Sequence, residues 1–345
     1  MTVQSADVFG PSGATTFEGL FGTPTVSVTG AAGFIGSHLV ERLLQLGCRV
    51  IGIDDFDPWY SPNQKRSNLS AIADNPRFEL VERTLSPEIA QEAFSRASVV
   101  FHLAGRPGVQ DSWGEGFIDS SRRNIELTQR VYEASVDCQV ERVVYASSSS
   151  IYGSGATSLD VSPEPRPISP YGVSKLVGEQ LAHVYRAQGL HITNLRYFTV
   201  YGPRQRPDMA MHRMFEATTS DGPTFVRRGD GQQRREFTYV NDVVTATVAA
   251  GFITEAANAT FDVGGGSSVS LQEVMTLVET LADAPMRIET VDAPAGDPAI
   301  TVARTDNAAD ILGWTPQIDL VEGLTRQCEW HRQRAASKGS LLVAD

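Results

Sequence analysis

The stretch TVSVTGAAGFIGSHL, Thr25–Leu39, decides the fold of this chain. The segment TVSVTG predicts a short β-strand, and the apolar spacing after the glycines predicts an amphipathic helix. Gly30, Gly33 and Gly36 fall between the two. Such a turn needs glycine where the backbone bends tightly and approaches a pyrophosphate, while the helix N-terminus presents N–H groups and the positive end of its dipole. The stretch therefore predicts a dinucleotide-binding turn.

A second signal of the same kind follows 24 residues after Gly30. The run RVIGID predicts a second strand that ends at Asp54, and Asp55 comes next. A carboxylate at this place accepts hydrogen bonds from the hydroxyls of an adenosine ribose and repels a 2′-phosphate. Acids that merely end a strand are the structural alternative, but the spacing of both signals favours a cofactor, and NAD over NADP.

The order of the expected elements indicates the architecture. Apolar runs alternate with amphipathic stretches, which predicts parallel βαβ units and an α/β fold with a doubly wound parallel sheet. The regular alternation ends after the run YGPRQRPD, so a smaller second lobe is expected there. We expect a loose extension at 1–22, an NAD-binding Rossmann domain at 23–200 to which 236–265 returns, and a substrate lobe at 201–235 and 266–345.

Composition narrows the class of protein. The chain has 345 residues, 41% hydrophobic and 20% charged, with a formal net charge of −12. This acidity argues against nucleic acid as a partner. The N-terminus lacks the pattern of a signal peptide and the sequence lacks an apolar run of 18 residues, so we expect no membrane association and a cytoplasmic location. Cys48, Cys138 and Cys328 lie far apart, which predicts free thiols and no metal site.

Tyr171 and Lys175, in the run SPYGVSK, are the first candidates for chemistry. Four residues apart, they share one face of the predicted helix. A free tyrosine, with a pKa of about 10, is a poor base at neutral pH. A neighbouring ammonium and the positive nicotinamide of bound NAD would favour the phenolate. This pair of residues alone is common by chance on helix surfaces and carries weight only with the cofactor signals.

Several longer motifs occur together with these residues. They are GAAGFIG, FHLAG, SSSSIYG, YGVSK, RYFTVYGPRQRPDM, RREFTYVNDVV and LGWTP. As a set they resemble the extended short-chain dehydrogenase/reductase family, in particular its nucleotide-sugar epimerases and dehydratases. The resemblance runs from about Pro24 to beyond Trp314.

The resemblance implies NAD as cofactor, a UDP-sugar as substrate and a homodimer. The cofactor residues that it implies are Gly30, Gly33, Phe34, Ile35, Gly36, Asp54, Asp55, Leu103, Ala104, Gly105, Asn124, Tyr171, Lys175 and Tyr197. Two positions depart from the family pattern, because Thr84 and Arg304 stand where an aspartate is expected.

The serine run in VYASSSSIYG, Val144–Gly153, is assigned by the same resemblance. The family's catalytic Ser or Thr lies four residues before the tyrosine of the Tyr-Gly turn, which makes Ser148 catalytic together with Tyr171 and Lys175. The next two positions are Asp-Glu in the dehydratases, and decarboxylases carry a Glu nearby. Here they are Ser149 and Ser150, so dehydration is not expected and decarboxylation is disfavoured.

Epimerisation at C4 through a transient 4-keto sugar is then the expected reaction, with UDP-glucuronate converted to UDP-galacturonate. The loop YFTVYGPRQRPDM is similar to that of enzymes acting on a uronate. Hydroxyl donors would hold the substrate carboxylate out of the alignment in which a β-keto acid loses CO₂. The substrate residues implied are Ser148, Ser149, Ser150, Thr199, Arg206 and, for the diphosphate, Arg235.

Other functions stay open at this point. A UDP-glucose/UDP-galactose 4-epimerase differs only around C6, and a UDP-glucuronate decarboxylase comes next. A non-catalytic NAD-binding protein of the same fold is the alternative from a different class. Arg204 fits either the uridine diphosphate or the surface of the lobe, and His102 is expected to be a core histidine rather than a base.

Overall fold

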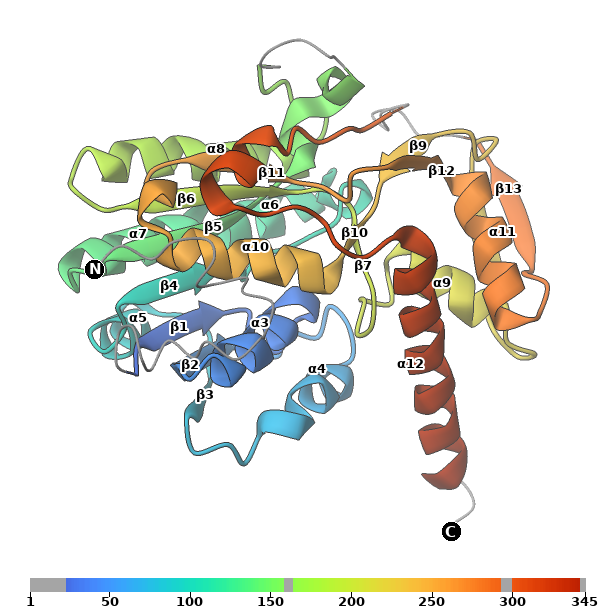
Figure 1. Cartoon of the computed structure of the whole chain (residues 1–345), viewed down its shortest axis with the longest axis horizontal. Coiled ribbons are helices and arrows are strands. Elements are labelled where there is room, and N and C mark those ends of the chain that lie inside the picture. The colour runs from blue at the N-terminus through green and yellow to red at the C-terminus, as the bar shows by residue number, and fades with distance from the viewer. Residues whose placement is uncertain (1–22, 158–163, 293–299, 342–345) are drawn as a thin grey trace.

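A seven-stranded parallel sheet forms the centre of the protein in the computed structural model (Figure 1). The structure describes residues 23–157, 164–292 and 300–341, so the expected N-terminal extension lies outside the described residues. The strand order is β11-β6-β5-β4-β1-β2-β3. In chain order the strands are β1 (Thr25–Thr29), β2 (Arg49–Asp54), β3 (Phe78–Glu82), β4 (Val99–His102), β5 (Arg142–Ser148), β6 (Ile192–Tyr197) and β11 (Thr260–Val263). The predicted doubly wound α/β fold is confirmed.

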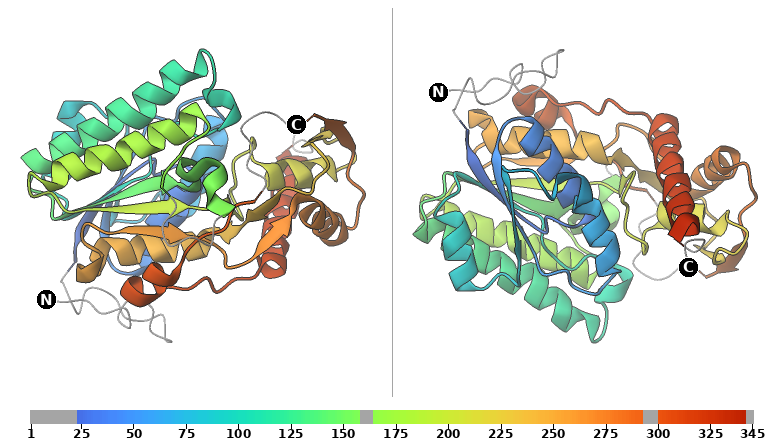
Figure 2. Two further views of the ribbon diagram at one scale, coloured as in Figure 1. Left: turned by 90° about the horizontal axis from the view of Figure 1, so that it is seen from above. Right: turned by 90° about the horizontal axis from the view of Figure 1, so that it is seen from below.

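The sheet is buried because helices cover both of its faces (Figure 2). One layer holds α3 (Phe34–Gln45) and α10 (Val240–Phe252), which pack together, and the other holds α5 (Pro87–Phe94), α7 (Leu127–Asp137) and α8 (Pro170–Arg186). Strands covered on both sides need apolar residues on both. Every residue of the run VVFH in β4 is accordingly buried.

The segment 236–265 contributes α10 and β11 to this domain, and β11 extends the sheet by pairing with β6. A two-stranded pair, β7 (Val200–Tyr201) with β10 (Thr238–Tyr239), lies where the chain passes to the smaller lobe. The lobe contains β8 (Phe225–Arg228) paired with β13 (Ile288–Val291), β9 (Arg234–Glu236) paired with β12 (Ser268–Ser270), and the helices α9 (Ala210–Ala217), α11 (Leu271–Ala282) and α12 (Leu320–Leu341).

Two further helices, α4 (Pro62–Leu69) and α6 (Gly116–Ser121), and several short helical segments lie in the connections. The short segments are Ser70–Ile72, Gln110–Ser112, Arg122–Glu126, Ser149–Thr157, Thr254–Ala256 and Ala308–Leu312. Arg122–Glu126 is a π-helical turn that joins α6 to α7. A π-helical turn widens a helix locally and is frequent at functional sites.

The two lobes contact each other through polar groups near the segment that joins them. The Arg204 guanidinium pairs with Glu41 of α3 at 2.6 Å. The ring nitrogen Nε2 of His38 lies 3.0 Å from the carbonyl of Pro203. Of the two roles left open for Arg204, these contacts support a structural one between the lobes.

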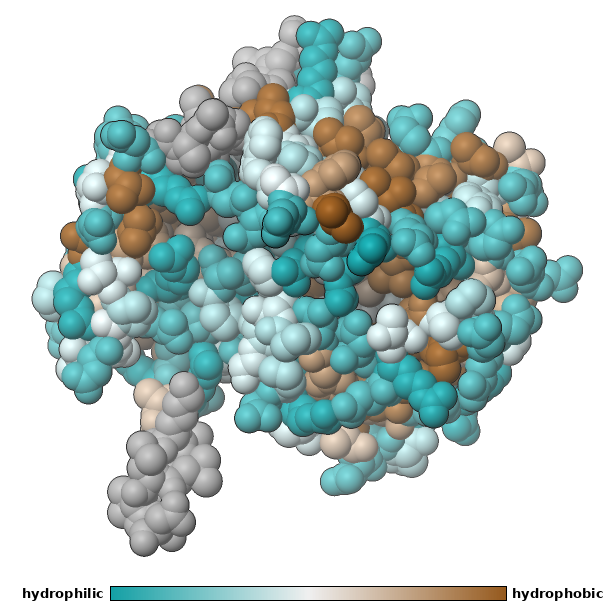
Figure 3. All heavy atoms as spheres, turned by 180° about the vertical axis from the view of Figure 1, so that it is seen from behind, coloured by the Kyte–Doolittle hydropathy of each residue, from teal (hydrophilic) through white to brown (hydrophobic). Residues whose placement is uncertain are grey.

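The outer surface carries mainly polar side chains with smaller apolar groups among them, as the space-filling view shows for one face (Figure 3). Within the described residues, no helix is long and apolar enough to cross a membrane. The same part of the chain contains no group of three or more His, Cys, Asp or Glu residues placed to hold a metal ion.

Candidate active site and cofactor cavity

A cavity of about 510 Å³ opens at the carboxyl ends of the sheet strands. Its wall includes Thr29 at the end of β1, Asp54 at the end of β2, Ser147 near the end of β5 and Tyr197 at the end of β6. Ligands of open α/β sheets bind in this place, where the strand order reverses. The cavity is therefore the candidate site.

The glycine turn fits a bound pyrophosphate. Gly30 has a φ of +72°, and a Cβ added to it would lie 2.8 Å from the backbone nitrogen of Ala104. A Cβ on Gly36 would lie 2.0 Å from the carbonyl oxygen of Gly30. Gly33 precedes α3 without a side chain to cap it, and the first turn of α3 has no acidic residue. The N–H groups and dipole at this end thus remain available to an anion.

Asp54 is held rigidly at the end of β2. Its carboxylate oxygens accept hydrogen bonds from the backbone N–H groups of Ala32 at 3.0 Å and Phe56 at 2.8 Å. Lys65 of α4 lies 3.4 Å away and is buried beside it. The carboxylate keeps further lone pairs for ribose hydroxyls. The arrangement fits an adenosine ribose at the position that the sequence predicted.

Tyr171 and Lys175 project from the first turns of α8, whose start is capped by the Ser169 hydroxyl, which accepts a hydrogen bond from the Gly172 N–H. The Lys175 ammonium is buried and donates to the carbonyl of Ala146 at 2.9 Å. Burial lowers the pKa of Lys175 to about 8. The ammonium is thus fixed against β5, next to the serine run.

Opposing effects act on the ionisation of Tyr171. Burial raises the pKa of its phenol, and the hydrogen bond with Ser148 and the charge of Arg206 oppose this only in part. Desolvation, which the sequence does not reveal, disfavours the phenolate that a neighbouring ammonium would favour. The phenolate therefore depends on the additional positive charge of a bound nicotinamide.

The serine run divides into a structural and a chemical part. Ser147 donates a 2.5 Å hydrogen bond to the carboxylate of Glu179 on α8, which is a structural role. Ser148 bonds to the Tyr171 phenol and lies 3.2 Å from the hydroxyl of Ser150. Ser148 was predicted from its position four residues before the tyrosine of the Tyr-Gly turn, and the structure places it beside Tyr171.

His102 is a core histidine, as expected. It is buried, and its two ring nitrogens lie 2.8 Å from the Thr29 hydroxyl and 3.0 Å from the Thr128 hydroxyl. Burial, with a smaller contribution from the charge of Lys175, lowers the pKa of His102 to about 3. A neutral, fully hydrogen-bonded imidazole has no free position from which to act as a base.

Most of the predicted cofactor residues line the one cavity, together with Arg206. They are Gly30, Gly33, Phe34, Ile35, Gly36, Asp54, Asp55, Leu103, Ala104, Gly105, Tyr171, Lys175 and Tyr197. The predicted residues outside its wall are Asn124, Ser148, Ser149, Ser150, Thr199 and Arg235.

The side chain of Asn124 is hydrogen-bonded to groups of the protein. Its side-chain oxygen accepts the N–H of Arg106 at 2.7 Å, and its nitrogen donates to the Arg106 carbonyl and to the Ser174 hydroxyl. These hydrogen bonds position the backbone of Arg106, and the implied contact of Asn124 with a cofactor stays a prediction. Arg235 lies on β9 and donates to the carbonyl of Arg234. The structure therefore does not bring Arg235 into the cavity.

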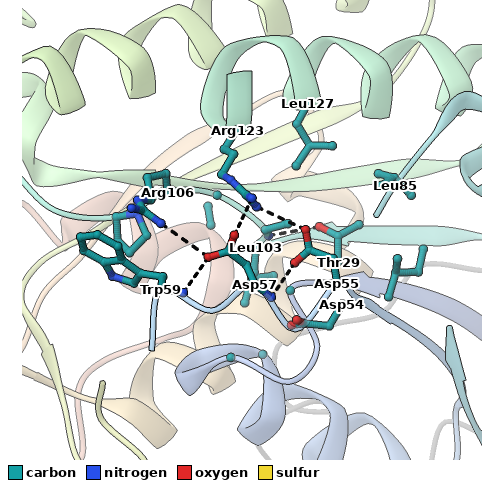
Figure 4. Close-up of a pocket in the computed structure, with 18 of the residues that line it drawn as sticks. Thr29, Asp54, Asp55, Asp57, Trp59, Leu85, Leu103, Arg106, Arg123 and Leu127 are labelled. Carbon is teal, nitrogen blue, oxygen red and sulfur yellow. Dashed lines mark hydrogen bonds and ion pairs between the residues drawn. The ribbon is translucent and has the colours of Figure 1, made fainter. Parts of the chain in front are cut away.

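Sequence reasoning missed several charged and aromatic residues of the cavity wall. Asp57, Trp59 and Tyr60 come from the loop after β2. Arg106 and Arg123 lie opposite Asp57 and Trp59 (Figure 4). The run DDFDPWY after the second strand is an available signal, because acids and aromatics are concentrated there. Their partners lie far away in the chain, so only the fold brings them together.

Comparison with known proteins agrees with this geometry. Residues 26–264 match the model of the NAD dependent epimerase/dehydratase family. A protein of Bacillus subtilis named as an uncharacterized UDP-glucose epimerase, YtcB, is 39% identical, with 88% of this chain and 96% of the relative covered. The UDP-glucuronate 4-epimerase of Thermodesulfobacterium geofontis is 32% identical, with 92% and 98% covered.

A solved structure is also similar. The UDP-glucuronic acid 4-epimerase of Bacillus cereus, in complex with UDP-glucuronic acid and NAD, superimposes with a TM-score of 0.84 at 35% identity. The match covers 90% of this chain and 99% of that one. The family match, the glycine turn and the placement of Asp54, Tyr171 and Lys175 are mutually consistent, and this chain belongs to the NAD dependent epimerase/dehydratase family.

Proposed function

We propose that the protein epimerises UDP-sugars at C4 with bound NAD, and that its substrate pair is UDP-glucuronate and UDP-galacturonate. The observation that carries this is the contact of Ser148 with Tyr171, one helical turn from the buried Lys175, in a serine run without a carboxylate. The similarity to the Bacillus cereus enzyme bound to UDP-glucuronic acid supports the choice of substrate.

Three residues have distinct roles in the proposed reaction. Tyr171 takes the proton of the C4 hydroxyl, Ser148 shares the same oxygen, and Lys175 holds the cofactor ribose and favours the phenolate. Bound NAD supplies the hydride acceptor and donor at C4. Tyr171 returns the proton after the sugar has turned over, so the reaction has no net redox change and the cofactor stays bound.

Arg206 is a cation of the cavity wall that lies near Tyr171. Its guanidinium pairs with Asp208 through two bonds of 3.0 Å, and its charge acts on Tyr171. A substrate carboxylate would compete with Asp208 for the same fork of donors. This supports the predicted role of Arg206 at the uronate end of the substrate.

The test is incubation of the purified protein with UDP-glucuronate, without added reductant, followed by proton NMR. UDP-galacturonate as the sole product is the expected result. UDP-xylose or a 4-keto-pentose with CO₂ would instead identify a decarboxylase, and an inert UDP-glucuronate would contradict the proposed substrate.

A second candidate is the interconversion of UDP-glucose and UDP-galactose, which the name of the Bacillus subtilis relative favours. The same residues would act at C4, since the two substrates differ only at C6. Parallel assays with both sugars separate the candidates by kcat/KM. A higher kcat/KM for UDP-glucose than for UDP-glucuronate would identify UDP-glucose as the substrate, and the reaction would still be an epimerisation at C4.

Replacing Ser149 and Ser150 together by alanine tests whether these serines bind the carboxylate of UDP-glucuronate. Hydroxyl donors that hold the carboxylate are lost, so we expect KM for UDP-glucuronate to rise about tenfold, or UDP-pentose to be released. KM for UDP-glucose should change less than twofold. Unchanged kinetics and product with UDP-glucuronate would remove these serines from the substrate site.

We also propose that the protein forms a homodimer through α6 and α8. Phe117 and Ile118 of α6 and Val173 and Val184 of α8 are 44%, 57%, 41% and 54% exposed, and the two helices are neighbours. Large apolar side chains gathered on adjacent helices indicate a protein interface, and a second copy presents the same surface. The cytoplasmic location stays a prediction.

The expected result of Ile118→Glu combined with Val184→Glu is a monomer in light scattering after gel filtration. Val321→Glu is the matched control, because Val321 is an equally exposed apolar residue on α12. A wild-type monomer, or a double variant that remains dimeric, would refute this interface.

A further inference from the structure

Two loops meet across the cavity through a cluster of opposite charges (Figure 4). We call the set Asp55, Asp57, Trp59, Arg106 and Arg123 the clasp. The first three belong to the loop after β2, Arg106 follows β4, and Arg123 lies in the π-helical turn. All five line the cavity.

Arg123 joins the loop after β2 to the opposite wall. Its guanidinium contacts the carboxylate of Asp57 at 2.5 Å and that of Asp55 at 3.2 Å. Its Nε atom donates to Asp119 at 3.1 Å. One guanidinium therefore holds three carboxylates, two of which belong to the loop after β2.

Arg106 makes the second connection between the same walls. Its guanidinium stacks on the Trp59 ring, 3.4 Å from the ring centroid, and pairs with Asp57 at 3.5 Å and Asp119 at 3.1 Å. Asn124 fixes the Arg106 backbone from both sides. The side chains of Asp57, Arg106 and Arg123 are 18% to 34% exposed, so solvent screens the ion pairs among them less than it screens fully exposed pairs.

The loop after β2 is also pre-shaped by its own hydrogen bonds. The Asp55 carboxylate accepts the N–H of Asp57 at 3.0 Å, and the Asp57 carboxylate accepts the N–H of Trp59 at 2.9 Å. Phe56 has a φ of +50°, a left-handed conformation that the Asp54 carboxylate stabilises by accepting its N–H. The loop is thus a rigid arm rather than a random connection.

The strand order shows what the clasp crosses. β1 lies between β4 and β2 in the sheet, so a contact between the loops after β4 and β2 passes over the carboxyl end of β1. The glycine turn that fits a pyrophosphate begins at this end, at Gly30. The clasp and the glycine turn therefore enclose the same stretch of the cavity from different sides.

Two polar atoms of the arm have no protein partner. The indole nitrogen of Trp59 and the hydroxyl of Tyr60 are buried without a hydrogen bond among the described residues, although both residues line the cavity. A buried donor without a partner is unfavourable, and an oxygen atom of a ligand in the cavity would supply one. This observation points to a ligand independently of the ion pairs.

We propose that the clasp closes over the bound dinucleotide and retains it through turnover, with the Trp59 indole N–H donating to one of its oxygen atoms. The proposal rests on the proposed function, because an epimerase without net redox change must keep its reduced cofactor until the hydride returns. Asp57 connects both arginines to the arm and is the central residue of the clasp.

The experiment measures the rate at which NADH leaves the protein, by its fluorescence after a chase with excess NAD. Asp57→Asn preserves the shape of the side chain but removes both ion pairs, and we expect about tenfold faster release. Trp59→Phe keeps an aromatic ring beside Arg106 but lacks the N–H, and roughly threefold to tenfold faster release is expected. Glu79→Gln is the control, because Glu79 forms an exposed ion pair with Arg96 outside the cavity.

Salt provides a second measurement on the unmodified protein. Release from the wild type should accelerate between low and high salt as the ion pairs are screened, while release from Asp57→Asn should change much less. This comparison remains informative even where one variant folds poorly, since it needs only the wild type and one well-folded variant.

If Asp57→Asn and Trp59→Phe both release NADH at the rate of Glu79→Gln, the proposal that the clasp retains the cofactor is wrong. Slower release from Asp57→Asn would mean that the acids hold the arginines away from the ligand, which also overturns the proposal. Faster release without epimerisation in the NMR assay would retain the clasp and reject the proposed function. Failure of the wild type to bind NADH would reject both.

Discussion

Replacing Tyr171 by phenylalanine is expected to lower kcat for UDP-sugar epimerisation by roughly 10³-fold while NAD remains bound. The phenol is the one group in contact with Ser148 that exchanges a proton with the C4 oxygen in the proposed reaction. Phenylalanine preserves the ring and its packing, so the cavity keeps its shape. KM should change far less than kcat, because the lost interaction acts in the transition state.

The measurement is product formation by proton NMR, together with the absorbance of NADH during a single turnover. Tyr185→Phe is the matched control, because Tyr185 lies on the same helix with its hydroxyl bonded to Gln129 and Glu133, away from the cavity. Near-normal activity of Tyr171→Phe would show that another group moves the proton. A loss of bound NAD would instead show that the tyrosine serves binding.

The raised pKa of Tyr171 gives this prediction an additional consequence. Because burial raises the pKa of the phenol, Tyr171 is protonated at neutral pH until further positive charge enters the site. The rate should therefore rise with pH until the phenol of the cofactor-bound protein has ionised. Tyr171→Phe should lose this dependence, which a purely structural role would not explain.

The sequence allowed the local parts of the site to be predicted. The glycine turn, Asp54, Tyr171 and Lys175 each follow from a short segment whose spacing has a direct physical meaning. The strand–helix alternation places the ends of those segments at one edge of a parallel sheet, where the structure has them. The spacing from the Tyr-Gly turn also identified Ser148, the serine that contacts Tyr171.

The features of the site that could not be predicted depend on contacts between residues far apart in the chain, which only the folded structure brings together. Asp57 and Arg123 are 66 residues apart, and their pairing exists only because β2 and the π-helical turn face the same cavity. The raised pKa of Tyr171 depends on burial, which no motif encodes. The hydrogen bonds of Asn124 to Arg106 and Ser174 could not be predicted either, because a resemblance gives a position but not the partners of its side chain.

Glu179→Ala is expected to have the largest effect on stability. Glu179 lies on α8 four residues after Lys175 and is buried, and its carboxylate binds the Arg196 guanidinium at 2.7 and 3.0 Å as well as the Ser147 hydroxyl. Removing one partner of a buried pair leaves the other charge uncompensated, at a cost of about 3–5 kcal/mol in the free energy of unfolding.

The hydrogen bonds of Glu179 also affect the position of the catalytic residues, so Glu179→Ala should lower activity as well as stability. Arg196 also donates to the Tyr152 hydroxyl, and that hydroxyl donates to the Asp262 carboxylate of β11, so the chain of bonds joins α8 to three strands. Ser147 is bound to Glu179, and Ser148 is the next residue along β5. Loss of the carboxylate should therefore loosen the serine that contacts Tyr171.

Urea denaturation measures the first effect and epimerisation kinetics the second. Glu322→Gln is the control, because Glu322 forms an exposed ion pair with Arg326 on α12, outside the cavity, and its loss should cost less than about 1 kcal/mol. For Glu179→Gln, which keeps a hydrogen-bond acceptor for Ser147, we expect an intermediate loss of stability and a kcat closer to that of the wild type. If both Glu179 variants were as stable as Glu322→Gln, water would replace the bonds of Glu179 at little cost, and β5 alone would have to hold Ser148 in position.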